Sequence, residues 1–302
     1  MYFTIFTPTY NRGDVLYRLY ESIKLQNFKD FEWIIVDDGS TDNTSEILEK
    51  ITKNENSIKI KYIKKENGGK HTAINLGVKV AKGDFFFIVD SDDYLPEDAL
   101  SIIFEYVEQI KNNRHYAGVA GLRGSNANNP WNNFGTGKQR TKNQSYLDKE
   151  YIDATSFEYR YKYKILGDRA EVVRTSILKK HPLPSYADEK FMTEGVLWSS
   201  LAHEGYLFRW FNKVVYITEE YRNDGLTKNI SEIHRKSPKG VREYNNLLAS
   251  CQELPFFVRF KAGVKYFEFG KYTTNGTTEL FKNFKWKFML LPCFIVSLLR
   301  SK

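Results

Sequence analysis

The chain has 302 residues, of which 41% are hydrophobic and 27% are charged. These values are close to those of ordinary globular proteins, so they exclude a disordered, collagen-like or polytopic membrane protein. Two cysteines exclude a disulfide framework, and together with the many lysines they fit a reducing cytoplasm. The first residues carry no basic segment and no long apolar run, so we expect a strand there and not a signal peptide.

The net charge of +8 is concentrated near the carboxyl end. Residues 228–302 hold 14 Lys or Arg and 5 Glu, which gives +9, whereas residues 1–227 hold 31 basic and 32 acidic residues, which gives −1. A basic segment of this kind predicts an anionic partner, either a membrane surface or a nucleic acid.

Short apolar runs alternate with helical patterns over the first 110 residues. The predicted strands are residues 2–7, 31–36, 58–63 and 84–89, and the predicted helices are residues 14–26, 42–53, 70–81 and 96–110. Pro8 is expected to end the first strand. The alternation predicts a mostly parallel sheet with helices on both faces, an α/β fold. In such sheets, ligands bind beyond the carboxyl ends of the strands.

The middle of the chain is less regular. Residues 123–150 are rich in Asn, Gly, Lys and Gln and predict a loop or lid, and residues 192–204 predict a helix. From residue 228 onward the chain becomes helical, basic and aromatic in pattern. The expected domains are 1–227, divided into a nucleotide-sugar half (1–120) and an acceptor half (121–227), and a helical extension at 228–302.

The most apolar stretch is residues 288–299. Its twelve residues fall short of the ~20 that a membrane-spanning helix needs. Basic residues flank it on both sides: Lys282, Lys285, Lys287, Arg300 and Lys302. Residues 282–302 therefore predict a segment in the interface of an anionic membrane, with Pro292 interrupting its helix. The alternative is a helix packed on the core or in a dimer.

The strongest chemical signal is Asp90-Ser91-Asp92, which follows a very apolar strand and is itself followed by Asp93. Such a triplet can be simple turn chemistry, with Asp93 as a helix cap. However, carboxylates after so apolar a strand cost stability unless they are solvated or liganded. Hard oxygen donors at this place suit Mg²⁺ or Mn²⁺, which would neutralise charge on a diphosphate leaving group.

Two further loops fall at the same edge of the predicted sheet. Residues 37–40 (Asp-Asp-Gly-Ser) form either an ordinary turn capped by Thr41 or Asp42, or a site where one carboxylate accepts the imide N–H of a uracil. Residues 67–70 (Asn-Gly-Gly-Lys) form either a simple turn or a close backbone approach to phosphate at a helix start.

Together, these motifs resemble the family 2 glycosyltransferases of the GT-A fold. The matching segments are Pro8-Thr-Tyr-Asn11, Val36-Asp-Asp-Gly-Ser-Thr-Asp42, Asn67-Gly-Gly-Lys70 and Asp90-Ser-Asp-Asp93. They occur in the family's order and near its spacing, strongly over about residues 1–120 and more weakly to about 227. The resemblance implies a nucleotide-sugar donor, usually a UDP-sugar, a divalent metal (Mn²⁺ or Mg²⁺) and inversion at the anomeric carbon.

The resemblance also implies roles for single residues. The donor-binding residues would be Pro8 and Tyr10 flanking the uracil, Asp38 pairing with the base, Lys70 near base or phosphate, Asp90 at the ribose with Ser91 beside it, and Asp92 at the metal.

An inverting transfer also needs a general base at the acceptor hydroxyl. The family places it in an acidic motif that opens a helix, and the first choice here is Glu194. Glu189 and Asp188 remain alternatives, because Gly195 stands where the family often has Asp. Glu194 could also do no more than favour the helix N-terminus. Trp198, on the same predicted helix, is assigned to the acceptor side.

Asp168 and Arg169 are expected near the start of a strand on the acceptor side. Asp168 would bind acceptor hydroxyls and Arg169 a diphosphate; a structural Asp–Arg pair is the alternative. Arg209-Trp210 is present, but the Q-x-x-R-W motif of processive synthases is not. A non-processive hexosyltransferase is therefore favoured.

These observations predict an inverting, metal-dependent transferase. It would move a sugar from a UDP-sugar to a hydroxyl of a saccharide or lipid-linked saccharide, in surface polysaccharide or cell-wall glycan synthesis. We expect it in the cytoplasm, peripheral on the inner face of the plasma membrane, with no nucleic acid partner. The alternative is a non-catalytic nucleotide- or nucleic-acid-binding protein that uses the basic tail. P-loop and dinucleotide-binding glycine motifs are absent from the sequence.

Overall fold

The computed structural model describes residues 1–130, 149–218, 230–273 and 276–300. The chain forms two compact units. The first contains Met1–Pro182 and Gly205–Glu220, and the second contains Leu183–Glu204 and Tyr221–Lys302. Most of the predicted lid, residues 131–148, lies outside the described residues.

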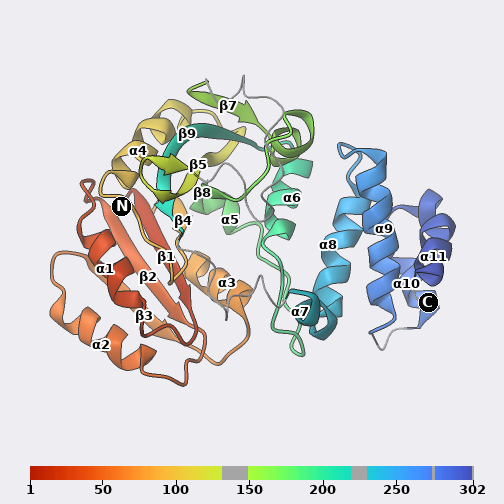
Figure 1. The fold of residues 1–302 in the computed structure, drawn as a ribbon, viewed down its shortest axis with the longest axis horizontal. Helices are drawn as coiled ribbons and strands as arrows, with labels where there is room; N and C mark the ends of the chain where they lie inside the picture. The colour runs from red at the N-terminus through yellow and green to blue at the C-terminus, as the bar shows by residue number, and fades with distance from the viewer. Residues whose placement is uncertain (131–148, 219–229, 274–275, 301–302) are drawn as a thin grey trace. The chain divides into compact units, whose positions relative to one another are not determined.

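The first unit is built around one nine-stranded sheet (Figure 1). Along the sheet the order is β3-β2-β1-β4-β8-β5-β9-β7, and β6 pairs with β5. The strands are β1 (Phe3–Thr9), β2 (Phe31–Asp37), β3 (Lys59–Lys64), β4 (Phe85–Ile88), β5 (Tyr116–Asn126), β6 (Asn129–Pro130), β7 (Tyr151–Ala154), β8 (Arg169–Arg174) and β9 (Leu207–Ile217). The helices are α1 (Leu16–Lys24), α2 (Thr44–Asn54), α3 (Lys70–Val80), α4 (Ala99–Ile110), the π-helix η2 (Glu158–Lys162) and α5 (Thr175–Leu178).

The sheet is parallel in its first half and mixed beyond it. β1 pairs in parallel with β2 and β4, and β2 with β3, as the alternating pattern predicts. β8 is antiparallel to both neighbours, β4 and β5, whereas β5 and β9 are parallel. The carboxyl ends of β1, β2 and β4 therefore meet at one edge of the sheet, where the polar motifs were predicted to gather.

Helices cover both faces of the sheet because successive side chains of each strand point to opposite faces. Phe3 and Ile5 of β1 belong to the same buried cluster as Leu16 of α1 and Ile103 of α4. Phe6, one position on, faces the other way and contacts α3. A Cβ on Gly77 of α3 would lie only 2.2 Å from the Phe6 ring, so glycine there permits the close packing of helix on sheet.

β1 continues through Pro8, so the prediction that Pro8 ends the strand is wrong. Proline has no N–H to donate to a neighbouring strand. Ile88, the last residue of β4, pairs with Phe6, and Pro8 lies beyond that pair on the β4 side. No ladder hydrogen bond is lost there, and β1 can extend to Thr9.

Helix α4 begins at Ala99, three residues later than predicted from Pro96. The buried Gln26 side chain explains the difference. Its Nε2 donates to the Pro96 carbonyl at 2.6 Å, and its Oε1 accepts the Leu100 N–H at 3.0 Å. Asp93 does not cap this helix, because the residue directly before α4 is Asp98. The Asp93 N–H instead donates to the Asp90 carbonyl at 3.1 Å, in an earlier turn.

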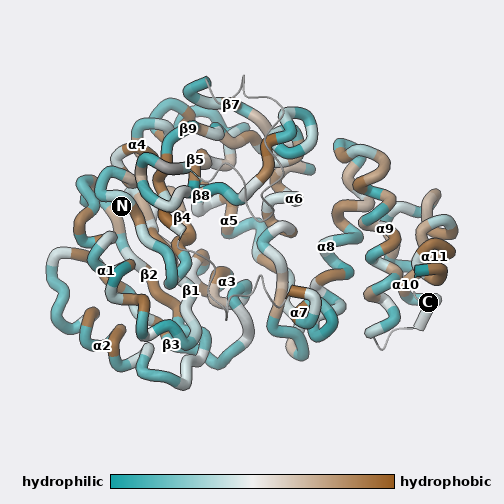
Figure 2. The backbone as a smooth tube through the Cα atoms, in the orientation of Figure 1, coloured by the Kyte–Doolittle hydropathy of each residue, from teal (hydrophilic) through white to brown (hydrophobic). Residues whose placement is uncertain are grey.

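The second unit is helical in its described residues. It contains α6 (Gly195–His203), α7 (Ile230–Lys236), α8 (Pro238–Ser250), α9 (Phe256–Gly270), α10 (Thr277–Asn283), the 3₁₀ helix η3 (Lys287–Met289) and α11 (Leu290–Leu299). The strongly hydrophobic α11 lies beside α9 (Figure 2). Pro292 does not interrupt α11, because it stands in the first turn, where its missing N–H has no intrahelical partner to lose. Within the described part of the chain, no helix is long and apolar enough to cross a membrane.

Candidate functional site

The loops after β1 and β2 are tied to each other at the carboxyl edge of the sheet. Asn11 makes both connections: its Oδ1 accepts the Thr41 N–H at 2.8 Å, and its own N–H donates to Ser40 Oγ at 2.9 Å. Its φ of 51° is left-handed, a conformation that asparagine tolerates better than most residues. The motif asparagine thus links the two loops directly.

The Asp37-Asp38 pair divides into two structural roles. Asp37 is fully buried and closes the turn after β2, with Oδ1 accepting the Ser40 N–H at 2.7 Å. Asp38 reaches the next loop instead. Its Oδ1 accepts from Lys65 Nζ at 2.5 Å and from the Gly68 N–H at 3.0 Å, and its Oδ2 accepts the Gly69 N–H at 2.7 Å.

Asp38 therefore fixes the glycine loop in this structure, and its pairing with a base stays a prediction. Its side chain is buried, and three donors from the chain already bind its oxygens. Gly69, with φ of 94°, takes a left-handed turn that brings its N–H onto the carboxylate. The first turn of α3, which begins at Lys70, is held in place by this contact.

Lys70 and Asp90 form an ion pair with 2.7 Å between Nζ and Oδ1. Burial alone would raise the pKa of Asp90, but the charges of Lys70 and Arg123 outweigh it and hold that pKa below its ordinary value. Tyr216 of β9 completes the surroundings, since its hydroxyl accepts the Asp90 N–H at 2.9 Å. Two of the predicted donor-binding residues, Lys70 and Asp90, are thus brought into direct contact.

Asp92 carries a partly exposed carboxylate. Arg12 Nε lies 3.9 Å from its Oδ2. The Asp92 carbonyl accepts from Arg18 Nη2 at 2.5 Å, which fixes the backbone of the triplet. Ser91 is buried beneath it. Asp93 is also buried, and desolvation together with the charge of Asp90 raises its pKa to about 7.

The Asp92 carboxylate suits a hard divalent cation, because it offers the oxygen ligands that Mg²⁺ and Mn²⁺ prefer. Asp92 is 34% exposed, so a cation and its bound diphosphate could reach it from solvent.

Pro8 and Tyr10 have different environments. Pro8 is buried within β1, and its place beside the uracil stays a prediction. Tyr10, just beyond the strand, is 45% exposed and presents an aromatic ring on which a base could stack.

Arg169 does not offer its guanidinium to a ligand, which corrects its assignment to a diphosphate. The side chain is buried, with Nε donating to the Tyr159 hydroxyl at 2.8 Å and Nη1 donating to the Asp168 carbonyl at 2.9 Å. Asp168 is exposed. Its backbone, and not its carboxylate, holds Arg169, and its negative charge helps to raise the pKa of Arg123.

In the second unit, the three candidate bases are in distinct environments. Glu194 immediately precedes α6, as predicted, and Trp198 lies partly buried within that helix. Glu189 is buried, and its two oxygens accept the N–H groups of Lys239 and Gly240 at 2.7 and 2.8 Å. Glu189 thus caps the start of α8, because the first N–H groups of a helix lack intrahelical partners.

Asp188 is exposed and pairs with Lys239, whose Nζ lies 2.6 Å from Oδ2. This hydrogen bond lowers the pKa of Asp188. A carboxylate bound in this way is a weaker proton acceptor.

Sequence reasoning missed several charged and polar residues at this edge: Arg12, Arg18, Lys65, Arg123 and Tyr216. Arg123 interrupts the apolar pattern near the end of β5, which is a usable signal for a charge at a strand end. Tyr216 lies in an apolar run of β9 and has no such signal.

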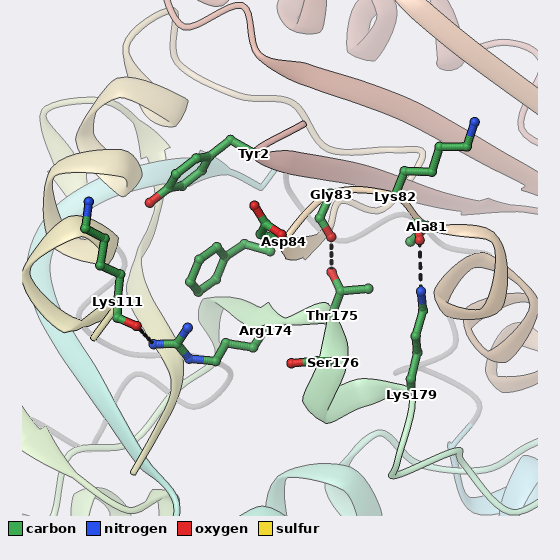
Figure 3. Close-up of a pocket in the computed structure, with 11 residues that line it drawn as sticks. Tyr2, Ala81, Lys82, Gly83, Asp84, Lys111, Arg174, Thr175, Ser176 and Lys179 are labelled. Carbon is green, nitrogen blue, oxygen red and sulfur yellow. Dashed lines mark hydrogen bonds between the residues drawn. The ribbon is translucent and has the colours of Figure 1, made fainter. Parts of the chain in front are cut away.

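A cavity of about 410 Å³ lies at the opposite edge of the sheet, where β1 and β4 begin (Figure 3). Its polar groups bind each other: Thr175 Oγ1 donates to the Gly83 carbonyl at 2.6 Å, and Lys179 Nζ donates to the Ala81 carbonyl at 3.1 Å. Arg174 likewise donates from Nη2 to the Lys111 carbonyl at 2.9 Å. These contacts are structural, and the candidate site stays at the carboxyl edge.

The mixed sheet, with helices on both faces and acidic loops at its carboxyl edge, has the architecture of the GT-A fold. The family model described as "Glycosyl transferase family 2" matches residues 4–166, more than half of the chain. The chain belongs to this family.

Two curated relatives are glycosyltransferases. Glycosyltransferase GlyG of Streptococcus pneumoniae is 36% identical over 106 residues, which cover 35% of this chain and 35% of that protein. The GalNAc(5)-diNAcBac-PP-undecaprenol beta-1,3-glucosyltransferase of Campylobacter jejuni is 28% identical over 233 residues, 76% of this chain and 68% of that one. The chain thus spans only about a third of the length of the first of these relatives.

Among solved structures, residues 1–349 of TarS from S. aureus, in complex with UDP-GlcNAc, match with a TM-score of 0.63 and 22% identity. The match covers 99% of this chain and 80% of that one. It confirms the predicted GT-A fold with a helical region after it.

Proposed function

We propose that this chain is an inverting glycosyltransferase that moves a sugar from a UDP-sugar to a hydroxyl of a saccharide or lipid-linked saccharide. The observation that carries the proposal is the contact between Lys70 and Asp90 beside the partly exposed Asp92, at the carboxyl edge of a family 2 sheet. The UDP-GlcNAc complex of the similar TarS fold supports the choice of UDP as the leaving group.

In this proposal the residues of the first unit bind and orient the donor. The exposed Tyr10 ring stacks on the base, and Asp90 binds the ribose while Lys70 balances its charge. Asp38 acts indirectly, by holding the glycine loop and the start of α3 at the nucleotide. Asp92 would hold Mn²⁺ or Mg²⁺, which supplies charge neutralisation at the diphosphate when bound.

Glu194 is the proposed general base that removes the proton from the acceptor hydroxyl. Its place directly before α6, where the resemblance puts the acidic residue, supports the choice; the buried Glu189 instead caps α8. Trp198, on the helix that Glu194 opens, is proposed to contact the acceptor, as is the exposed carboxylate of Asp168. One sugar is added per encounter, since the processive motif is absent from the sequence.

The setting we propose is surface polysaccharide or cell-wall glycan synthesis, at the inner face of the plasma membrane. The undecaprenol-linked substrate in the name of the C. jejuni relative supports a lipid-linked acceptor. Residues 1–227 would perform the transfer, and residues 228–302 would place the enzyme at its acceptor.

The test is a screen of UDP-sugars for UDP release by the full chain, with Mn²⁺, with Mg²⁺ and with a chelator. We expect release with one or a few donors that the chelator abolishes, and an inverted anomeric configuration in the product by NMR. Failure to bind any nucleotide-sugar, together with salt-sensitive binding of nucleic acid, would favour the non-catalytic alternative.

A further inference from the structure

Helix α11 and the turn before it expose a row of large apolar side chains. Phe288 is 95% exposed, and the others are between 47% and 68% exposed. The row consists of Phe288, Leu291, Ile295, Leu298 and Leu299, which we call the apolar face. Steps of three and four residues place these side chains on one side of the helix.

The opposite side of α11 packs on its own unit. Cys293 and Ser297 are fully buried. Cys293 lies against α9 so closely that a Cβ on Gly263 would come within 2.5 Å of its Sγ. The Phe294 ring packs edge-on against Phe267 of α9, with centroids 5.5 Å apart. The helix is therefore anchored through one side, and the apolar face points outward from a fixed position.

Basic residues border the apolar face. Lys282, Lys285 and Lys287 precede it and Arg300 follows, and the sequence has no acidic residue from Lys282 to Lys302. Trp286 lies among these basic residues, directly before Lys287. The Arg259 guanidinium stacks over its ring, with 4.1 Å between the guanidinium carbon and the ring centroid.

The apolar surface continues onto the start of α9. Phe256 is 61% exposed and meets the Trp286 ring edge-on, with centroids 5.6 Å apart. Trp286 thus connects an exposed phenylalanine of α9 to the turn that carries Phe288. Aromatic side chains of this kind favour the boundary between lipid and water.

We propose that the apolar face docks on an anionic membrane surface and lies in its headgroup region. The apolar side chains would enter the lipid boundary while the lysines bind anionic headgroups. A second copy of the chain fits less well, because a symmetric contact would set Lys282, Lys285 and Lys287 of one copy against the same lysines of the other. A nucleic acid would pair with the lysines but leave the apolar side chains uncovered.

The test compares the full chain with the variant Leu291→Glu/Ile295→Glu/Leu298→Glu in sedimentation with vesicles. The vesicles contain phosphatidylglycerol and phosphatidylcholine, or phosphatidylcholine alone. We expect the unchanged chain to pellet with the anionic vesicles and the triple variant to bind at least about tenfold more weakly. The matched control is Leu25→Glu/Leu166→Glu, which alters exposed leucines of the first unit and should bind as the unchanged chain does.

A second variant, Lys282→Gln/Lys285→Gln/Lys287→Gln, separates the two contributions. It leaves the apolar face intact, so we expect its binding to anionic vesicles to fall to the level seen with neutral ones. High salt should weaken the unchanged chain in the same way. Circular dichroism and UDP affinity should be those of the unchanged chain in both variants.

Two results would overturn the proposal. One is equal, negligible pelleting of the unchanged chain and the triple variant. The other is a dimer in light scattering that the triple variant converts to a monomer, which would make the apolar face a contact between copies. Vesicle binding needs neither donor nor acceptor. The chain can therefore release UDP without binding vesicles, or bind vesicles without releasing UDP, so the two proposals are tested separately.

Discussion

Lys70 Nζ lies 2.7 Å from Asp90 Oδ1, and this ion pair joins the first turn of α3 to the loop after β4. Arg123 adds a second positive charge, so the pKa of Asp90 stays below its ordinary value although burial acts to raise it. The charged form of Asp90 is thus kept next to Asp92, where the proposed donor would bind.

We predict that Lys70→Met and Asp90→Asn each weaken UDP binding, and that their effects are not additive. The two side chains act as a pair. The double variant should therefore lose less binding free energy than the two single variants added together, with a coupling energy of roughly 1 kcal/mol. Isothermal calorimetry with UDP and Mn²⁺ measures it. Lys79→Met, an exposed lysine in the last turn of the same helix, is the control. Strictly additive losses would show that the ion pair has no role in binding.

We predict that Asp92→Asn removes the dependence of UDP binding on Mn²⁺ without unfolding the protein. The amide lacks the negative charge that a hard cation requires, and the side chain is 34% exposed, so little packing changes. Calorimetry with and without Mn²⁺, alongside thermal unfolding, measures both effects. Asp98→Asn alters an exposed carboxylate that makes no capping hydrogen bond at α4 and should behave as the unchanged chain. Unchanged metal-dependent affinity in Asp92→Asn would remove Asp92 from the site.

Glu194→Gln and Glu189→Gln should separate a catalytic role from a structural one. Glu194→Gln is expected to keep donor binding and lower kcat by about 10²–10⁴-fold, the usual contribution of a general base. Glu189→Gln replaces one acceptor of a backbone N–H by an amide donor, so it should lower the free energy of unfolding by about 1–3 kcal/mol. Turnover assays and urea unfolding of both variants distinguish the catalytic role from the structural one. Normal turnover in Glu194→Gln with lost turnover in a folded Glu189→Gln would exchange the two assignments.

Asp38→Ala should destabilise the protein even when no nucleotide is present. The change leaves the Gly68 and Gly69 N–H groups and the Lys65 ammonium without their shared acceptor, at a cost of about 3 kcal/mol. Urea unfolding of the free protein measures this, with Asp30→Ala, an exposed carboxylate, as the control. A loss of UDP affinity with no loss of stability would instead mean that Asp38 serves the base directly.

Glu55 should make stability depend on pH in the acid range. Hydrogen bonds from Ser57 and from the Tyr20 hydroxyl lower its pKa to about 2. Because its pKa in the folded state is depressed, its contribution is present above the ordinary value near 4.5 and is lost as the pH falls toward 2. Glu55→Gln should therefore cost roughly 2 kcal/mol at pH 7 and progressively less below pH 4. Urea unfolding at pH 7 and pH 3 checks it, and an equal cost at both values would contradict it.

The sequence alone predicted the parallel half of the sheet and the edge where the motifs lie. Both follow from local chemistry: apolar runs of strand length, helical periodicity between them, and polar residues directly after β2 and β4. Helix α6 was predicted for the same reason, although it begins at Gly195 and not at residue 192. Membership of family 2 also followed, since its motifs are short and contiguous.

Only the tertiary structure decided which side chains share the site and which serve the scaffold. Asp90 and Tyr216 are 126 residues apart in sequence yet in direct contact, and no local pattern marks the tyrosine. Glu189 and Glu194 look alike as acidic residues near a helix, but folding sets the start of α8 on the first of them.

The same distinction holds for Arg169 and for α11. Arg169 was expected to bind a diphosphate, and its burial among carbonyls and Tyr159 removes it from that role. For the segment after Lys287, the apolar residues were evident, but the packing of Cys293 against α9 determines which of them stay exposed. Hydrogen bonds and burial depend on neighbours brought together from distant parts of the chain, and so they are settled only when the chain has folded.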